Sequence, residues 1–537
     1  MDSLLHFEGL ADFHFDNFGR LWTMNWAGRH FPQAIWFDPS AKGKKVRTYE
    51  FLSTLKSYHE IHGYVSQDDG SVWIRGNGIF GKFNESEHKF ELIPSDSRTG
   101  LGVMYDIVTT MYEDEEKNVW VGTNNFGLYR FNPSQQYFKN ITHKNPLQGT
   151  EGHGSVMSFI ELRNGDILAG AWSDGLFRYN SRLEEKPLNF QVVGNDRVTS
   201  PWDMCYSADS NTVWIASQPG LFQYDVAKGV MYYKNPAALL GRTIRQVAED
   251  KQGNLWLGMQ SIGLYKWVNP KGKKDSVVRI PGIGNGIITK VMADTKGYIW
   301  VTSERHGVYA YESATGQVRF HWNNRAPADS NKIIEGFSNV LEYNDSSVLI
   351  STATKIYHFN RRTNMLSQMQ LPAPLLGSIA SMEQDNAGFL WISTSNGLYR
   401  YNPFTRVLIF FNREDGIIND HFIFSASYKR RNGSLLFGAD YSFIHFNPAA
   451  VTFPNGGQKV VLTGLQIGRR DIPVDSVLQL DLLTLSPGEN SMTVQFSSLT
   501  YTAYSVIQYK LEGIDKEWHT ADKDNKAAFP FLPPGRY

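Results

Sequence analysis

A short module recurs along this chain, and the recurrence constrains the fold more than any other feature. Its clearest copy spans 249–268 and reads EDKQGNLWLGMQSIGLYKWV. With the run before it, the copy predicts three antiparallel strands at 243–250, 255–258 and 264–267. Gly253 sits where the first hairpin turn needs a left-handed backbone. One such meander cannot bury both of its faces, so it must pack against copies of itself.

Ten copies are recognisable by the residue that follows the first turn. From the first copy to the last, nine intervals span 414 residues, which gives a mean period of 46. Four-stranded propeller blades have about this period, and a helical repeat would need apolar spacing that is absent. A fourth strand is expected at 136–138, 231–233, 318–320 and 407–410. The marker positions are Trp22, Trp73, Trp120, Leu168, Trp214, Trp256, Trp300, Leu349, Trp391 and Leu436.

Composition argues against several functional classes. The chain has 53 Lys and Arg and 53 Asp and Glu, so it lacks the positive excess that a nucleic-acid partner would need. Cys205 is the single cysteine, and the histidines show no metal-ligand spacing, so we expect neither a metal nor a cofactor. Acidic stretches at 67–70 and 113–116 lack the spacing of a calcium loop, and we interpret them as hairpin turns.

The repeat pattern D-x-x-G-N-L-W-L-G followed by G-L-Y-x-Y resembles the two-component regulator propeller repeat. It is similar to the sensor regions of hybrid two-component systems of Bacteroides-type bacteria. That resemblance implies two consecutive seven-bladed rings followed by an immunoglobulin-like domain. The tail, after a linker at 454–457, resembles the triple-tyrosine domain of the same family through Tyr501, Tyr509, Leu511, Gly513, Trp518 and Tyr537.

We therefore predict an all-β chain with three parts. Residues 1–140 would hold three blades of an incomplete N-terminal propeller, and 141–453 a complete seven-bladed β-propeller. Residues 454–537 would form a C-terminally truncated immunoglobulin-like β-sandwich. The chain would be a fragment of a longer periplasmic sensor of an inner-membrane histidine kinase, because three blades do not complete the first ring and the sandwich stops at least one strand short. No signal peptide, membrane-spanning run or kinase is recognised in this sequence. The resemblance also implies a homodimer formed through the C-terminal domain of the full-length protein.

One end of the propeller is the better candidate for binding. The turns between the first and second strands are uniform, whereas the loops on the opposite end vary, and variable loops on a rigid scaffold usually carry binding. Trp172 and Trp202 fall outside the repeat register, and an aromatic ring beside polar groups suits a sugar. Taken singly, each candidate also has a simpler explanation in packing or at the surface. The candidates are His153, Trp172, Asp174, Trp202, Asp203, Arg245, Gln260, Glu304, Arg305, His306, His421, Asp440 and Tyr441.

Three functions remain open on this evidence. The first is a non-enzymatic sensor that binds an oligosaccharide and signals through the C-terminal sandwich to a kinase outside this chain. The second is a propeller glycosidase or polysaccharide lyase, which would need two carboxylates about 5–10 Å apart from among Asp174, Asp203, Glu304 and Asp440. The third is a protein-interaction scaffold.

Overall fold

The computed structural model is all-β, as predicted, and contains one short helix, α1 (Val474–Val477), among the residues it describes. The chain forms two compact units, Met1–Val451 and Thr452–Tyr537. The residues described are 9–25, 32–42, 45–51, 59–96, 102–144, 152–194, 198–323, 325–326, 329–333, 335–451, 459–500, 507–521 and 524–537.

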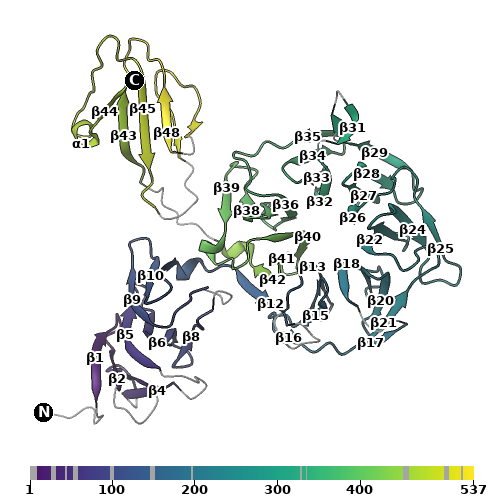
Figure 1. The fold of residues 1–537 in the computed structure, drawn as a ribbon, viewed down its shortest axis with the longest axis horizontal. Helices are drawn as coiled ribbons and strands as arrows, with labels where there is room; N and C mark the ends of the chain where they lie inside the picture. The colour runs from purple at the N-terminus through teal and green to yellow at the C-terminus, as the bar shows by residue number, and fades with distance from the viewer. Residues whose placement is uncertain are drawn as a thin grey trace. The chain divides into compact units, whose positions relative to one another are not determined.

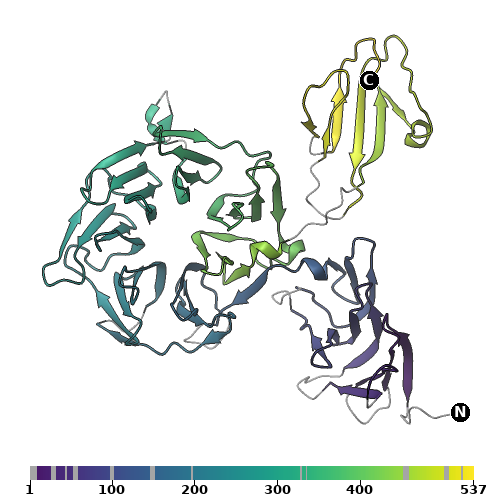
Figure 2. The same cartoon turned by 180° about the vertical axis from the view of Figure 1, so that it is seen from behind.

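Seven sheets of the first unit stand side by side in a ring, which Figures 1 and 2 show from opposite sides. Their inner strands contact one another in chain order, and the last inner strand also contacts the first. We number these sheets blades 1 to 7. The inner strands, from blade 1 to blade 7, are β13 (Val156–Glu161), β18 (Ser200–Tyr206), β22 (Ile244–Glu249), β26 (Ile288–Ala293), β32 (Phe337–Asn344), β36 (Ile379–Gln384) and β40 (Phe422–Lys429).

Each blade continues outward through antiparallel neighbours. In blades 1 to 3 these are β14 (Ile167–Ala171), β15 (Gly175–Tyr179) and β16 (Glu185–Lys186); β19 (Thr212–Gln218), β20 (Leu221–Asp225) and β21 (Val230–Lys234); and β23 (Leu255–Met259), β24 (Leu264–Val268) and β25 (Ser276–Arg279). In blades 4 to 6 they are β27 (Tyr298–Ser303), β28 (Gly307–Glu312) and β29 (Val318–Trp322); β33 (Ser347–Thr352), β34 (Ile356–Asn360) and β35 (Met365–Gln368); and β37 (Leu390–Thr394), β38 (Gly397–Tyr401) and β39 (Leu408–Phe411). A small hairpin, β30 (Arg325–Ala326) and β31 (Asp329–Ile333), lies between blades 4 and 5 in the chain.

Blade 7 is completed by a strand from the other end of the ring sequence. Its own strands are β40, β41 (Leu435–Ala439) and β42 (Ser442–Phe446), and the outermost strand is β12 (Lys139–Thr142), antiparallel to β42. The Asn140 side chain strengthens this closure, because it donates to Gly416 O at 2.7 Å and accepts from Ile418 N at 3.0 Å. The boundary predicted after Asn140 therefore falls inside a strand of the ring.

The fourth strand predicted at 136–138 was wrong. The chain there leaves a short 3-10 turn, η1 (Pro133–Gln135), and Phe138 then packs its ring against Phe411 and Phe446 of the large ring. The strand forms directly afterwards, as β12, and pairs with blade 7 rather than with the preceding sheet.

Three further sheets precede the ring. The first sheet contains β1 (Leu10–Phe15), β2 (Leu21–Asn25), β3 (Gln33–Phe37) and β4 (Val46–Glu50). The second contains β5 (Glu60–Ser66), β6 (Val72–Asn77), β7 (Phe80–Asn84) and β8 (Lys89–Leu92). The third contains β9 (Val108–Glu113), β10 (Val119–Thr123) and β11 (Leu128–Phe131). The first two sheets bury an aromatic cluster between them, in which Trp22 stacks on Trp36 at 5.1 Å and contacts Phe83 at 4.9 Å.

The second unit is a small β structure. One sheet has the order β44 (Arg470–Ile472), β43 (Val461–Ile467), β45 (Met492–Ser497), β48 (Lys526–Phe529), and a hairpin pairs β46 (Gln508–Tyr509) with β47 (His519–Thr520). Tyr509 lies edge-on to Phe529 at 5.7 Å. Tyr501 and the linker at 454–457 lie outside the described residues, so the triple-tyrosine domain stays a prediction.

An aspartate clamp fixes the first turn of many blades. In blade 3, Asp250 accepts the backbone N–H of Gln252 at 3.0 Å and of Asn254 at 2.9 Å, and its other oxygen accepts the indole N–H of Trp256 at 3.0 Å. The turn itself closes through Gly253, whose φ of 79° confirms the left-handed position predicted for it. One carboxylate thus satisfies the turn and the largest core side chain at once.

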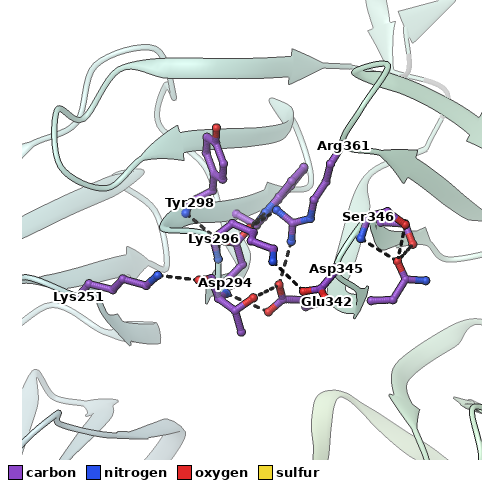
Figure 3. A network of polar contacts seen from close by, with 12 residues as sticks. Lys251, Asp294, Lys296, Tyr298, Glu342, Asp345, Ser346 and Arg361 are labelled. Carbon is purple, nitrogen blue, oxygen red and sulfur yellow. Dashed lines mark hydrogen bonds and ion pairs between the residues drawn. The ribbon is translucent and has the colours of Figure 1, made fainter.

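The same clamp recurs at four other turns, where Asp16, Asp114, Asp294 and Asp385 hold Trp22, Trp120, Trp300 and Trp391 in the same way. Figure 3 shows the clamp at Asp294, which also bonds the N–H of Tyr298 and pairs with Arg361 of the next blade at 2.6 Å. The stretches at 67–70 and 113–116 are hairpin turns, as predicted.

Replacing Asp385 by alanine tests this clamp. The buried indole N–H of Trp391 and two turn N–H groups would lose their acceptor. At about 1–3 kcal/mol for an unsatisfied buried group, we expect the free energy of unfolding to fall by about 2–4 kcal/mol. The measurement is urea unfolding followed by tryptophan fluorescence.

Asp345→Ala is the matched control, because the Asp345 side chain is 91% exposed in the neighbouring blade and pairs only at the surface with Lys296. Its effect should stay within about 0.5 kcal/mol. Equal destabilisation by the two substitutions would contradict the clamp.

Candidate functional site

A β-bulge at the same place in six successive inner strands shapes one end of the ring. In blades 1 to 6 the pairing with the second strand skips one residue near the start of the inner strand. A bulge adds an unpaired residue and re-aims its side chain. The six bulged residues are Met157, Trp202, Arg245, Thr289, Ser338 and Ala380.

The bulges bring Trp202 and Arg245 together, because these residues hold equivalent places in adjacent blades. The Arg245 guanidinium lies over the Trp202 ring at 4.2 Å and donates to the side-chain oxygen of Gln260 at 3.0 Å. Trp172, in the turn between β14 and β15, places its ring 6.4 Å from that of Trp202 and is 52% exposed. We call Trp172, Trp202, Arg245 and Gln260 the aromatic platform.

A groove of about 1450 Å³ runs along this face beside the platform and crosses blades 1, 2 and 3. Trp172 and Gln260 belong both to the platform and to the lining of the groove. Apolar side chains of Leu176, Leu188, Phe190, Val192 and Val198 form one part of the lining, and polar groups of His153, Thr199, Ser200, Gln218, Arg242 and Ser261 form another. This volume exceeds that of a typical small-molecule pocket, about 300–1000 Å³.

The apolar wall comes from an unexpected fifth strand. The link from blade 1 to blade 2 runs as β17 (Gln191–Val193), parallel to β21 at the outer edge of blade 2. Leu188, Phe190 and Val192 pack against the core of that blade and line the groove. Sequence reasoning missed this wall and also missed Arg242. The alternation of apolar residues at 188, 190 and 192 was the available signal for the wall.

Asp174 supports the rim of the groove rather than presenting a free carboxylate. Its Oδ2 lies 2.8 Å from Nε2 of buried His143 and accepts the backbone N–H of His153 at 2.9 Å and of Gly154 at 2.7 Å. Burial acts to raise the pKa of Asp174, but the hydrogen bonds from Gly154 and His143 outweigh it and the pKa is lowered. Asp174 thus lines the groove and also positions its rim, and its role in ligand binding stays a prediction.

The predicted placement of Asp203 on the loop face is wrong, because this residue lies inside the ring. It follows the bulge in β18, accepts the N–H of Val247 at 3.1 Å, and burial raises its pKa. Lys290 lies near enough to Asp203 and to Glu383 to act on both charges. Protein surrounds most of the Glu383 side chain, and part of it stays accessible to water. Because this burial removes hydration from the carboxylate, the pKa of Glu383 is raised to about 7, although Ser427 donates a hydrogen bond to it.

The remaining predicted residues lie on the same face but do not line the groove. Glu304, Arg305 and His306 form the turn between β27 and β28, where Nε2 of His306 lies 3.0 Å from Asn285 O. In blade 7, His421 lies 3.1 Å from Asp440, which accepts the Ser155 hydroxyl of blade 1 at 2.7 Å. Tyr441 occupies the tight turn between β41 and β42, with a φ of 46°.

The described residues contain neither a metal-binding cluster nor a membrane-spanning helix. No group of three or more His, Cys, Asp or Glu there could hold a metal ion. Within the same residues, no helix has the length and apolar character needed to cross a membrane.

Comparison with known proteins gives the chain a class. The sequence pattern of the family described as Two component regulator propeller matches residues 102–125 and 238–261, and the second match contains Arg242, Arg245 and Gln260. The chain is thus a β-propeller protein that carries two-component regulator propeller repeats. Histidine kinase P4 of Formosa agariphila is 21% identical over 304 residues, which are 49% of this chain and 22% of that relative's length.

Solved structures resemble the chain weakly. Two are extracellular domains of hybrid two component systems of B. thetaiotaomicron. One is 17% identical, covers 99% of this chain and 72% of that chain, and has a TM-score of 0.48. The other is 15% identical, covers 99% of this chain and 95% of that chain, and has a TM-score of 0.30.

The raised pKa of Glu383 predicts a pH-dependent stability. Between the ordinary value of 4.5 and about 7, the folded protein holds a proton on Glu383 that the unfolded chain has lost. Raising the pH through this window should therefore lower the free energy of unfolding, by about 1–3 kcal/mol, and the loss should level off above pH 7.

Glu383→Gln should remove this loss, so the variant should be more stable than the parent at pH 8 and differ little from it near pH 4.5. Unfolding by urea at pH values from 4.5 to 8.5 measures the difference. Glu304→Gln, an exposed carboxylate on the loop face, is the control. A pH slope unchanged by Glu383→Gln would show that this group does not carry the dependence.

Proposed function

We propose that this chain is the ligand-binding part of a two-component sensor and that the groove beside the aromatic platform binds an oligosaccharide. The observation that carries the proposal is the exposed Trp172 ring next to Trp202 and Arg245. The tryptophans that do stand in the ring's repeat register, Trp214, Trp256, Trp300 and Trp391, are by contrast buried. A half-exposed indole at the lip of a groove therefore has no packing role that explains it.

A sugar fits this chemistry better than a purely apolar ligand. Indole faces stack on the C–H faces of sugar rings, and polar side chains fix the hydroxyl groups. The groove offers both, because Trp172 lies on one side and Thr199, Gln218 and Gln260 supply hydroxyl and amide groups. Its length across three blades suits several linked sugar units rather than one.

The glycosidase alternative lacks its acid in the groove. Among the residues lining the groove, Asp174 is the single carboxylate, and its pKa is lowered rather than raised. Asp203 has a raised pKa but faces the interior of the ring, and Glu304 and Asp440 lie away from the groove. A hydrolytic pair needs one proton donor and one ionised carboxylate facing the same bond. This arrangement favours binding without turnover.

The wider context is proposed on the repeat family. In this proposal the chain lies in the periplasm as part of a membrane-bound histidine kinase, and occupancy of the groove is signalled through the C-terminal β-sandwich to a kinase. Homodimerisation through that sandwich would place two sensors together.

Replacing Trp172 by alanine should weaken oligosaccharide binding at least tenfold. The change removes the stacking surface but no core side chain, so the unfolding curve should stay the same. A glycan array with neutral and acidic oligosaccharides, followed by calorimetry on the ligands that bind, makes the measurement.

Phe404→Ala is the control, since Phe404 is 80% exposed in a loop on the opposite end of the ring. If Trp172→Ala binds as tightly as the parent chain, the groove is not the site. If no oligosaccharide binds, the carbohydrate proposal fails, and if products form, the chain is an enzyme.

A further inference from the structure

We propose that the oligosaccharide bound in the groove is acidic and that Arg242 and Arg245 bind its carboxylate or sulfate groups. This inference rests on the proposed function and narrows its ligand class. Its basis is a difference in charge: Arg242 lines the groove and Arg245 lies beside it, whereas Asp174, the single carboxylate of the lining, is already hydrogen-bonded.

Arg242 lines the groove from an anchored turn. It follows β21 in the link to blade 3, where its N–H bonds Leu239 O at 3.0 Å and Gly241 N–H bonds the Asn235 side chain at 2.7 Å. Leu239 is fully buried, so the turn is held to the core. The Arg242 side chain is exposed, and within the described part of the chain no carboxylate pairs with it.

Arg245 is half-buried, and no carboxylate among the described residues forms an ion pair with it. Its contacts are the Trp202 ring and the amide oxygen of Gln260. Burial lowers its pKa, and Glu304 acts on it only through a longer-range attraction. A guanidinium removed from water is costly unless a negative charge compensates it.

Two other half-buried arginines of the ring, Arg178 and Arg361, have carboxylate partners. Arg178 lies 2.6 Å from Asp166, and Arg361 lies 2.6 Å from Asp294 and 3.0 Å from Glu342. Both hold structural carboxylates in the turns at the opposite end of the ring. Arg245 differs because its neighbours are an aromatic face and an amide, which position a guanidinium without neutralising it.

The groove's own acid does not compensate the two arginines. Asp174 already bonds His143 and two backbone N–H groups, so its negative charge is compensated within the rim of the groove. An anionic ligand in the groove would therefore meet Arg242 in the lining and Arg245 on the adjoining aromatic platform, while Asp174, the single carboxylate of the lining, is already hydrogen-bonded. Guanidinium groups bind carboxylate and sulfate through paired, charge-assisted hydrogen bonds, which gives selectivity over neutral sugars.

The test uses matched pairs of oligosaccharides that differ in charge. Tetragalacturonate and its methyl ester test a carboxylate, and a κ-carrageenan tetrasaccharide and its desulfated form test a sulfate. We expect the acidic member of at least one pair to bind at least tenfold more tightly than the neutral member by calorimetry. The pair that shows the preference identifies the anion. Equal affinities within both pairs would overturn the inference, and so would equal binding of a tetraglutamate peptide.

Arg242→Gln and Arg245→Gln should each weaken binding of the acidic member about tenfold and leave the neutral member unchanged. Arg362→Gln, an exposed arginine in a loop on the opposite end, should change neither. If Arg245→Gln disturbs folding, Arg242→Gln still decides. Loss of binding on Trp172→Ala with no effect of either arginine variant would overturn this inference and leave the carbohydrate proposal standing. Binding of neither member of either pair would overturn both.

Discussion

The hydrogen bond from a buried indole to a turn aspartate is the interaction that fixes blades 3, 4 and 6 of the ring, whereas leucine stands at the same position in blades 1, 5 and 7. Where a blade buries a tryptophan between two sheets, the indole N–H must find an acceptor away from water. Asp250, Asp294 and Asp385 provide it while also closing the first hairpin turn. The indole N–H of Trp214 has a different acceptor, because it donates at 2.9 Å to the carboxylate of Glu249 in the next blade. One end of the ring is thereby fixed by structure, and this leaves the other end free to vary.

Closure of the ring comes from a pairing that local sequence does not encode. The module predicted the strands of each blade closely, such as 255–258 for β23 (Leu255–Met259), because apolar alternation and turn residues act over a few positions. It failed at 136–138, because the partner of β12 is β42, about three hundred residues further along the chain. The packing of Phe138 on Phe411 and Phe446 decides that choice, and a periodicity cannot show it.

The candidate site was predictable in place but not in the roles of its residues. The register showed that Trp172 and Trp202 were not core tryptophans, and the variable loops indicated the end of the ring where the groove lies. The sequence could not show that Asp174 faces His143 or that Asp203 turns inward, because both follow from backbone geometry. It also gave no reason to choose Arg242, since a single charged residue in a loop is ordinary, and only the surrounding groove makes it notable.

A common backbone device therefore carries different chemistry from blade to blade. In blades 1, 4, 5 and 6 the bulged positions hold Met157, Thr289, Ser338 and Ala380, side chains that satisfy themselves locally or pack. In blades 2 and 3 they hold Trp202 and Arg245, a large ring and a cation without a paired carboxylate among the described residues. Such a pair costs folding energy that a threonine or alanine would not. The proposed binding role explains why Trp202 and Arg245, which destabilise the fold, lie beside the groove. A ligand anion would supply the negative charge that Arg245 lacks among its described neighbours.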